Sequence, residues 1–254
     1  MNQLEHIDEF RKALKDYKLS ESAKKTLADL RMVLMVGPTS SGRNTVIREL
    51  VKTGAYHFIV SDTTRQPREN SGVMEKSGRE YWFRSEDEVL DEIRNGEFLE
   101  AAIIHNQQVS GISIRELEIA RQTDKVAITE VEIVGADNTY RAKPDTTIIF
   151  SVPPGFDKWM DRLHNRGKLP QDEVRRRLES ACLEFDAALT KDYYRFVIND
   201  DIDETVALVD SMIRLDQVDE KREAAARELV KDLYQETRDY LASTLHGVPS
   251  RMQS

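Results

Sequence analysis

The stretch Gly37-Pro38-Thr39-Ser40-Ser41-Gly42-Arg43-Asn44-Thr45 follows the apolar run Met32–Val36, and it decides how the rest of the chain is interpreted. Its glycines have the spacing of a phosphate-binding loop, in which lysine and then serine or threonine follow the second glycine. Backbone N–H groups at the start of a helix suit an anion. The segment therefore predicts a strand, a turn around a nucleoside phosphate, and a helix from about Asn44 to Lys52.

The chemistry of this loop departs from the usual pattern at three positions. Arg43 replaces the lysine and keeps its charge, but a planar guanidinium is wider than an ammonium group. Asn44 replaces the first hydroxyl and offers Mg²⁺ only an amide oxygen, while Thr45 stands one position later. A positive φ at Ser40 would be strained. Taken alone, the segment fits an ordinary strand–turn–helix equally well.

Composition limits the class of protein. The chain has 254 residues, of which 39% are hydrophobic and 33% charged, enough for one large α/β domain with appendages. Its net charge of −9 argues against non-specific nucleic-acid binding. Residues 1–10 are polar and no stretch approaches a membrane span. The single Cys182 excludes an intramolecular disulfide and a cysteine-based zinc site. We expect a cytoplasmic protein.

Hydrophobic periodicity predicts helices at both ends and an α/β region between them. In residues 1–30, Leu4, Ile7, Phe10, Leu14 and Tyr17 share one helical face, and Ser20 is the expected cap of a second helix. Strands and helices then alternate, which predicts a parallel sheet with helices on both faces and ligands at the carboxyl ends of the strands. The expected strands are Met32–Val36, Tyr56–Val60, Ala101–His105, Val126–Val131, Thr147–Val152 and Phe196–Asn199.

A last helix is expected from about Asp216 to His246, with Leu229, Val230, Leu233 and further apolar residues on one side. The simpler interpretation packs it on its own domain or on the N-terminal helices. The alternative is a homodimer or a partner held through the terminal helices.

Six further segments follow the loop in order: residues 61–68 (SDTTRQPR), 78–83 (GREYWF), 96–100 (GEFLE), 129–136 (TEVEIVGA), an arginine series from 162 to 177, and 199–201 (NDD). Two arginines such as Arg65 and Arg68 can grip one phosphate bidentately, although a basic surface loop would look similar. Together these segments resemble the guanylate kinases, and the resemblance covers residues 31–214.

The resemblance implies an α/β P-loop NTPase-type fold with a small acceptor-binding subdomain and an arginine-bearing lid. It implies that ATP is the donor, GMP the acceptor and Mg²⁺ the cofactor. The GMP phosphate would be held by Ser61, Arg65, Arg68 and Tyr81. Glu100 would accept hydrogen bonds from N1 and the amino group of guanine. The implied domains are an N-terminal helical extension (1–30), the kinase-like domain (31–215, acceptor part about 61–112, lid about 162–177), and a C-terminal helix and tail (216–254).

The sequence departs from the family in the acceptor region. Relatives have Tyr-Gly-Thr or Tyr-Gly-Ser where residues 105–113 read HNQQVSGIS, so a hydroxyl for guanine would come from Ser110 or Ser113. The amide-rich part of this segment is either a remodelled contact or a polar turn. Glu130 and Glu132 stand where relatives place aspartates around the metal and the guanine, and both are assigned to the acceptor site.

The donor site implied by the resemblance consists of the loop and one residue after the last strand, namely Gly37, Thr39, Ser40, Ser41, Gly42, Arg43, Asn44, Thr45 and Asn199. Magnesium would be held, together with ATP, by Asn44, Thr45 and Glu130. The residues expected to neutralise charge during transfer are Arg43, Arg162, Arg166 and Arg177.

Three functions are compatible with these residues. The first is phosphoryl transfer from ATP to GMP. The second is a non-catalytic nucleotide- or protein-binding module, which the altered Arg43 and Asn44 favour and the retained lid arginines oppose. The third is a kinase of another monophosphate or of a sugar phosphate, which the altered segment 105–113 allows.

Overall fold

Helices and strands of the chain are divided between two compact units. The structure is a computed structural model that describes residues 4–70, 72–104, 106–165 and 169–245. The first unit comprises residues 1–32, 54–129 and 134–146, and the second comprises residues 33–53, 130–133 and 147–254. Among the described residues, no helix combines the length and the apolar character needed to cross a bilayer.

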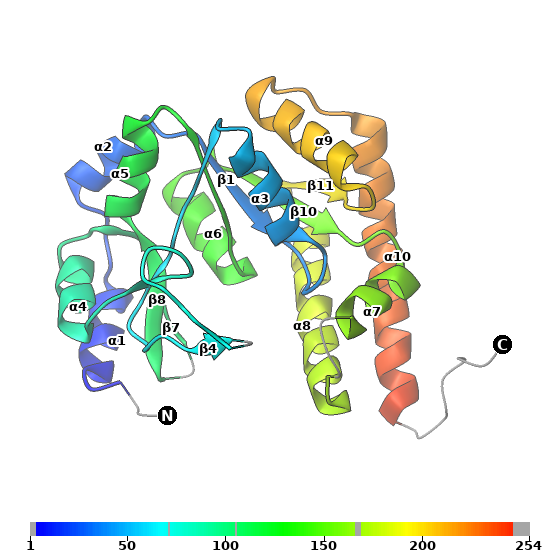
Figure 1. Cartoon of the computed structure of the whole chain (residues 1–254), viewed down its shortest axis with the longest axis horizontal. Helices are drawn as coiled ribbons and strands as arrows, with labels where there is room; N and C mark the ends of the chain where they lie inside the picture. Colours follow the sequence, from blue (N-terminus) through cyan, green and yellow to red (C-terminus); the bar gives the residue numbers. More distant parts are fainter. Residues whose placement is uncertain (1–3, 71, 105, 166–168, 246–254) are drawn as a thin grey trace. The chain divides into compact units, whose positions relative to one another are not determined.

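The second unit is built on three parallel strands. Strand β1 (Met32–Val36) pairs with β10 (Thr147–Val152), and β10 pairs with β11 (Tyr194–Ile198). All five residues of β1 are buried, which explains its uninterrupted apolar sequence. The helices of this unit are α3 (Arg43–Lys52), α7 (Phe156–His164), α8 (Gln171–Thr190), α9 (Ile202–Arg214) and α10 (Glu220–Leu245) (Figure 1).

The C-terminal helix α10 packs within its own unit, along α8 and β11. Ala226, Val230, Leu233 and Thr237 are buried at these contacts. The guanidinium of Arg227 lies 4.6 Å from the centre of the Phe196 ring on β11. This packing within its own unit is the simpler of the two predicted arrangements. The helix begins at Glu220, four residues later than the predicted Asp216.

The first unit contains a parallel pair and a four-stranded sheet. Strand β2 (Tyr56–Phe58) pairs with β9 (Val126–Glu130). The four-stranded sheet has the order β6-β3-β8-β7, and its strands are β3 (Asp62–Thr63), β6 (Trp82–Phe83), β7 (Phe98–Ile104) and β8 (Gln108–Ser113). A short hairpin is formed by β4 (Glu69–Asn70) and β5 (Val73–Met74), and the helices are α4 (Glu86–Arg94), α5 (Ile114–Gln122) and α6 (Ile133–Ala142).

One predicted strand belongs to a different sheet from the one expected. Ala101–His105 was expected among the parallel strands, but its residues form most of β7, which runs antiparallel to β8. Asn106 has a φ of 58° and turns the chain back at this point. His105 itself lies outside the described residues. Other strand ends differ by one or two residues, and the parallel strands flanked by helices give the predicted α/β fold.

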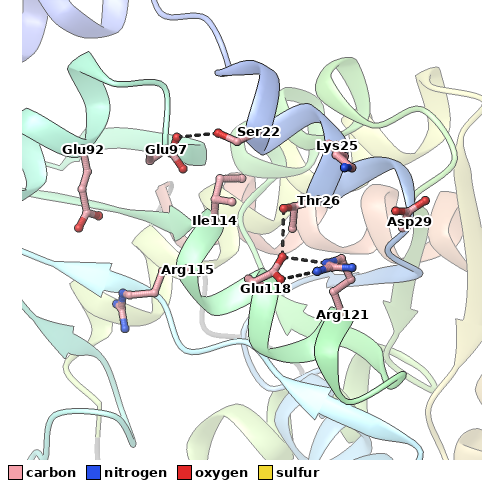
Figure 2. Close-up of a pocket in the computed structure, with 10 residues that line it drawn as sticks. All are labelled: Ser22, Lys25, Thr26, Asp29, Glu92, Glu97, Ile114, Arg115, Glu118 and Arg121. Carbon is pink, nitrogen blue, oxygen red and sulfur yellow. Dashed lines mark hydrogen bonds and ion pairs between the residues drawn. The ribbon is translucent and has the colours of Figure 1, made fainter.

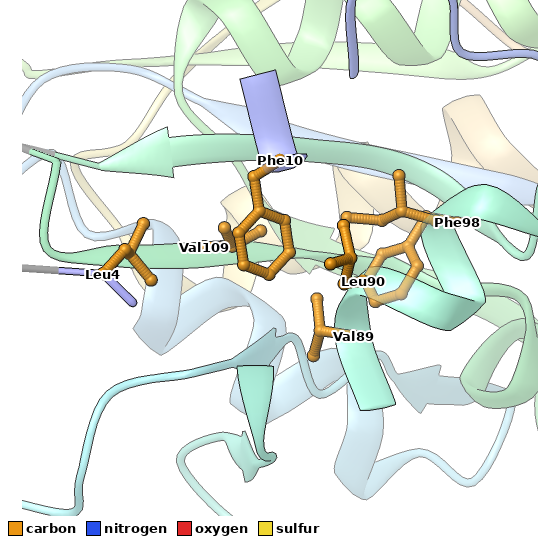
Figure 3. Packing of buried hydrophobic residues seen from close by; sticks show 7 residues of the cluster. Leu4, Phe10, Val89, Leu90, Phe98 and Val109 are labelled. Atoms are coloured by element: carbon orange, nitrogen blue, oxygen red, sulfur yellow. The ribbon is translucent and has the colours of Figure 1, made fainter. Parts of the chain in front are cut away.

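The N-terminal segment forms the two predicted helices, α1 (Ile7–Lys15) and α2 (Glu21–Ala28). Its predicted apolar face is confirmed, because Leu4 and Phe10 are buried against α4, β7 and β8 (Figure 3). The cluster consists of Leu4, Phe10, Val89, Leu90, Ile93, Phe98 and Val109, with Ile7, Leu14 and Tyr17 packed at its edge. Ser20 caps α2 by accepting a hydrogen bond from the N–H of Ala23 at 3.0 Å.

Candidate active site

The phosphate loop connects β1 to α3, and both of its frame glycines are required by close approaches. Gly37 has a φ of 137°, and a Cβ there would lie 2.6 Å from the carbonyl oxygen of Ser151. Gly42 is the N-cap of α3 with a φ of 91°, and a Cβ there would lie 2.2 Å from Nδ2 of Asn199. A side chain at either position would collide with its neighbour, so the glycine spacing read from the sequence has a steric cause.

Three hydrogen bonds fix the course of the loop without any ligand. The carbonyl of Ser41 accepts from Nδ2 of Asn199 at 2.8 Å and from Oγ of Ser151 at 3.2 Å. The carbonyl of Thr39 accepts from Nε1 of Trp159 at 2.8 Å. Asn199, which the sequence assigns to the donor site, therefore uses its amide to support the loop.

Two hydroxyl groups of the loop are buried without a protein partner. Ser40 is 8% exposed and Ser41 is fully buried, and neither Oγ has a hydrogen-bond partner among the described residues. A buried unpaired hydroxyl costs about 1–3 kcal/mol. Phosphate oxygens would satisfy both groups, so the loop fits a nucleoside phosphate.

Arg43, at the lysine position, has acidic groups near it. Its Nε is 3.6 Å from Oε2 of Glu130, and 14% of the Arg43 side chain is exposed. Burial raises the pKa of Glu184 on α8 to about 7, an effect that the charge of Glu132 increases and that of Arg43 opposes. Sequence reasoning missed Glu184. The available signal was an acidic residue on the same helical face as the buried Ala181 and Ala188.

The predicted magnesium ligands stand close to the loop. Asn44 and Thr45 lie in the first turn of α3, and Glu130 ends β9. Within the described ranges, no three His, Cys, Asp or Glu side chains group as they would to hold a metal ion. Magnesium in phosphoryl-transfer sites is bound by one or two carboxylates together with the substrate phosphates. This donor set fits a metal that arrives with ATP.

The predicted lid arginines have different surroundings. Nη1 of Arg162 on α7 donates to the carbonyl of Asn199 at 2.8 Å. Asn199 is the residue whose side-chain amide supports the phosphate loop. Nε of Arg177 donates to Glu173 of its own helix at 2.8 Å. Arg166 lies outside the described residues.

In the first unit, Arg65 is held in a defined orientation. Its Nη1 and Nη2 donate to the two carboxylate oxygens of Glu75 at 2.5 and 3.0 Å. The guanidinium lies 4.8 Å from the ring centre of Tyr81 and 5.4 Å from that of Phe83. The hydrogen bonds from Arg65 lower the pKa of Glu75 to about 2 despite its burial. The structure thus places Arg65 directly over Tyr81 and pairs it with Glu75, a residue that sequence reasoning did not identify.

The other predicted phosphate and base contacts are more scattered. The side chain of Arg68 is exposed, while its N–H donates to Glu75 at 2.8 Å. Ser61 is half-buried. Ser113 is fully buried at the start of α5, and Oγ of Ser110 donates to Thr63 at 2.9 Å.

Glu100, the predicted base-recognition residue, lies on β7 at the wall of a cavity of about 420 Å³. Burial raises the pKa of Glu100 to about 7. The cavity is lined from α1, the α1–α2 connection, β7 and α6 by Leu14, Tyr17, Leu19, Leu99, Glu100, Ala101, Asn138, Arg141 and Ala142.

A glycine-framed loop between a buried parallel strand and a helix, with buried hydroxyls that lack partners, defines a P-loop nucleotide-binding protein of the α/β class. The sequence profile of the guanylate kinases matches residues 29–216. The guanylate kinase of Corynebacterium efficiens is 35% identical over 185 residues, which are 72% of this chain and 94% of that protein. The chain belongs to the guanylate kinase family.

Other relatives agree with this assignment. The guanylate kinase of Corynebacterium diphtheriae is 35% identical over 179 residues, 70% of this chain and 91% of that protein. The crystal structure of guanylate kinase from Anaplasma phagocytophilum has a TM-score of 0.53 at 24% identity and covers 80% of this chain and 94% of that one. This last likeness concerns the fold alone.

Proposed function

We propose that this protein transfers the γ-phosphoryl group of ATP to GMP, producing ADP and GDP. Family membership supports the reaction class. The observation that carries the proposal is the rigid phosphate loop, with the unpaired hydroxyls of Ser40 and Ser41 in a steric frame that only glycine allows. The orientation of Arg65 by Glu75 and Tyr81 supports an acceptor that carries a phosphate.

In the proposed reaction, an oxygen of the GMP phosphate attacks the γ-phosphorus of ATP, and the bond to the β–γ bridging oxygen breaks. No nucleophilic side chain is required, because positioning and charge neutralisation carry the catalysis. Residues of the loop hold the donor phosphates, and Arg65, Arg68, Tyr81 and Ser61 hold the acceptor phosphate. Glu100 takes the base edge, with Ser113, Glu130 and Glu132 as the further acceptor residues that we propose.

The charge that shifts during transfer is proposed to be neutralised by Arg43, Arg162, Arg166 and Arg177. Mg²⁺ bound with ATP would supply further charge stabilisation near Asn44, Thr45 and Glu130. We propose that the reaction takes place in the cytoplasm, where a chain with a single cysteine needs no disulfide. We also propose the domain boundaries 1–30, 31–215 and 216–254. A homodimer through the terminal helices is a further proposal, which a mass measurement in solution would test.

A second candidate is a non-catalytic binding module, and the replacements at Arg43 and Asn44 are its motivation. The pairing of Arg43 with Glu130 argues against it, because both residues are longer than the family's and still meet each other. A site that had lost its function would have no evident reason to keep this contact.

The deciding experiment measures ADP formation from Mg·ATP with GMP, dGMP, IMP, AMP, CMP and UMP. We expect turnover with GMP as the preferred acceptor. Binding of GMP without turnover of any acceptor would leave only the binding module, and preference for another acceptor would refute the assigned specificity. The variant Arg65→Ala should raise KM for GMP about tenfold or more, because it removes charged hydrogen bonds worth about 1.5–3 kcal/mol.

A further inference from the structure

The N-terminal helical segment, residues 4–28, lies outside the region that matches the family profile, yet it is attached to both ends of β7. Near the start of the strand, the N–H of Ser20 donates to the carbonyl of Gly96 at 3.0 Å. Beyond its end, the N–H of Leu4 donates to the carbonyl of Asn106 at 3.3 Å. Since β7 is an edge strand of its sheet, this segment covers an edge that would otherwise be open.

Tyr17 makes the most specific of these contacts. Its hydroxyl accepts a hydrogen bond from the N–H of Phe98 at 2.8 Å and donates to the carbonyl of the same residue. Burial raises the pKa of Tyr17 to about 12, so the phenol remains a donor at neutral pH. One side chain thus satisfies both backbone groups of a single strand residue.

The contact falls at an irregularity of the sheet. The pairing register between β7 and β8 shifts between Phe98 and Glu100, as in a β-bulge. Bulges re-aim the side chains that follow them and are common beside functional sites. The hydroxyl of Tyr17 therefore binds the strand at the bulge, two residues before Glu100.

A second set of contacts holds the same strand start. Oε1 of Glu97 accepts from Oγ of Ser20 at 2.8 Å and from Oγ of Ser22 at 3.3 Å. Figure 2 shows the Ser22–Glu97 bond and a further bond from Thr26 of α2 to Glu118 of α5, at 3.1 Å. Helix α2 and its cap are thus tied to the start of β7 and to α5.

The segment also borders the space in front of Glu100. Leu14, Tyr17 and Leu19 line the 420 Å³ cavity that Glu100 borders, and they make that side of it largely apolar. An apolar wall strengthens the hydrogen bonds that a carboxyl group makes to a ligand and excludes water that would compete for them.

We propose that Tyr17 is a positioning residue for base recognition and that the N-terminal helices are a working part of the acceptor site. Tyr17 acts through the bulge at Phe98 to hold Glu100 in the direction that meets the base. This inference rests on the proposed function, in which Glu100 accepts hydrogen bonds from N1 and the 2-amino group of guanine.

The test is Tyr17→Phe in the full chain, which removes the hydroxyl and keeps the ring. KM and kcat are measured for GMP and IMP at saturating Mg·ATP, and KM is measured for ATP. IMP lacks the 2-amino group, so misdirection of Glu100 affects GMP more than IMP. We expect KM for GMP to rise about tenfold, the preference for GMP over IMP to fall severalfold, and KM for ATP to stay unchanged.

The matched control is Tyr234→Phe on α10, whose ring lies under Arg238 in the second unit, and we expect it to behave like the wild type. An unchanged KM for GMP, or an equal loss with GMP and IMP, would overturn the proposal, because general destabilisation does not discriminate between the two bases. If Tyr17→Phe does not fold, Glu97→Ala decides, because it removes the group that accepts from Ser20 and Ser22 at the same strand start. A reduced preference for GMP supports the proposal, and an unchanged preference overturns it.

Failure of the proposed function gives a different result. In that case the wild type turns over no monophosphate. The affinities of wild type and variant for GMP and IMP are then measured by calorimetry instead of KM and kcat. A selective loss of GMP affinity in Tyr17→Phe would support the positioning role even then, and equal affinities in variant and wild type would refute it.

Discussion

Arg43 and Glu130 illustrate how the site is adjusted at the scale of single residues. Both side chains are longer than those the family places there, and their charged groups lie 3.6 Å apart. A guanidinium offers donors in a fixed planar arrangement, whereas an ammonium is a point charge on a flexible stem. Exchanging one for the other changes geometry even when the charge is kept.

Arg43→Lys should therefore lower kcat, although it restores the usual residue of the motif. We expect a loss of about tenfold, equivalent to about 1.4 kcal/mol, with little change in KM for GMP. Steady-state kinetics check this, with Arg48→Lys as the control, since Arg48 lies on the same helix and 63% of its side chain is exposed. A rise in kcat would mean that the loop is merely weakened by arginine.

The backbone of the loop carries strain at Ser40, whose φ is 68°. A left-handed conformation costs a non-glycine residue about 1–2 kcal/mol, which glycine would relieve at some entropic cost to folding. Ser40→Gly should leave stability unchanged or raise it by up to about 1 kcal/mol. Ser41→Gly removes an equivalent buried, unpaired hydroxyl at a position without positive φ, so it should be less stable than Ser40→Gly by about the relieved strain of 1–2 kcal/mol. Urea unfolding of both variants tests this, and equal effects would contradict it.

Glu184 should give the protein a characteristic pH dependence. Its pKa is about 7 in the folded state against 4.5 for the free group, so the folded state binds the proton more tightly. Stability contributed by the neutral form is complete below about pH 4.5 and is lost as pH rises to about 7. Glu184→Gln should remove this loss and raise stability at pH 8 relative to the wild type. Thermal melts between pH 5 and 8 measure it, and parallel curves would contradict the assignment.

The site residues that could be predicted from the sequence are those that stand in short motifs with a recognisable spacing. The glycine frame of the loop has a fixed spacing, and Arg65 and Tyr81 stand in compact motifs. Glu75 and Glu184 were missed because their roles depend on tertiary contacts. Glu75 reaches Arg65 only after the β4–β5 hairpin folds back, and Glu184 feels the charge of Arg43 from a helix distant in sequence.

At the scale of elements, apolar sequence predicted the strands well where burial is complete. β1 and β10 have the predicted ends, since both are almost entirely buried. β7 was assigned to the wrong sheet, because its partner is chosen by the turn at Asn106 rather than by its own composition. The apolar face of α1 was predicted correctly, but periodicity alone does not say that its partners are α4 and β7.

Helix α10 should contribute substantially to stability, because it covers α8 and β11. Leu233 is fully buried on it, and Leu233→Ala should cost about 2–5 kcal/mol through lost burial and the cavity left behind. Lys231→Ala, two residues away on the exposed side, should change stability by less than about 0.5 kcal/mol. Urea unfolding of the two variants measures the difference, and a small loss for Leu233→Ala would mean that α10 is weakly attached.

At the scale of the whole molecule, most residues proposed for the two substrates lie in different units, although Glu130 and Glu132 of the proposed acceptor set belong to the second unit. The loop, Ser151, Asn199 and the described lid arginines belong to the second unit, whereas Arg65, Tyr81 and Glu100 belong to the first. Each ligand should therefore stabilise mainly the unit that holds its residues. This separation makes the two binding events distinguishable in one experiment.

Hydrogen exchange should resolve them. GMP should slow amide exchange in peptides covering residues 56–68 and 98–104, and Mg·ATP in those covering residues 33–52. At 100 times Kd, a ligand stabilises its site by about 2.7 kcal/mol, which corresponds to exchange up to about 100-fold slower where opening of that site controls it. At the same GMP concentration, a tenfold weaker Kd in Arg65→Ala should lower the protection by GMP to about tenfold and leave that by ATP intact. If GMP instead protected residues 33–52 in the absence of ATP, the acceptor would bind at the loop and the assignment of the two units would be reversed.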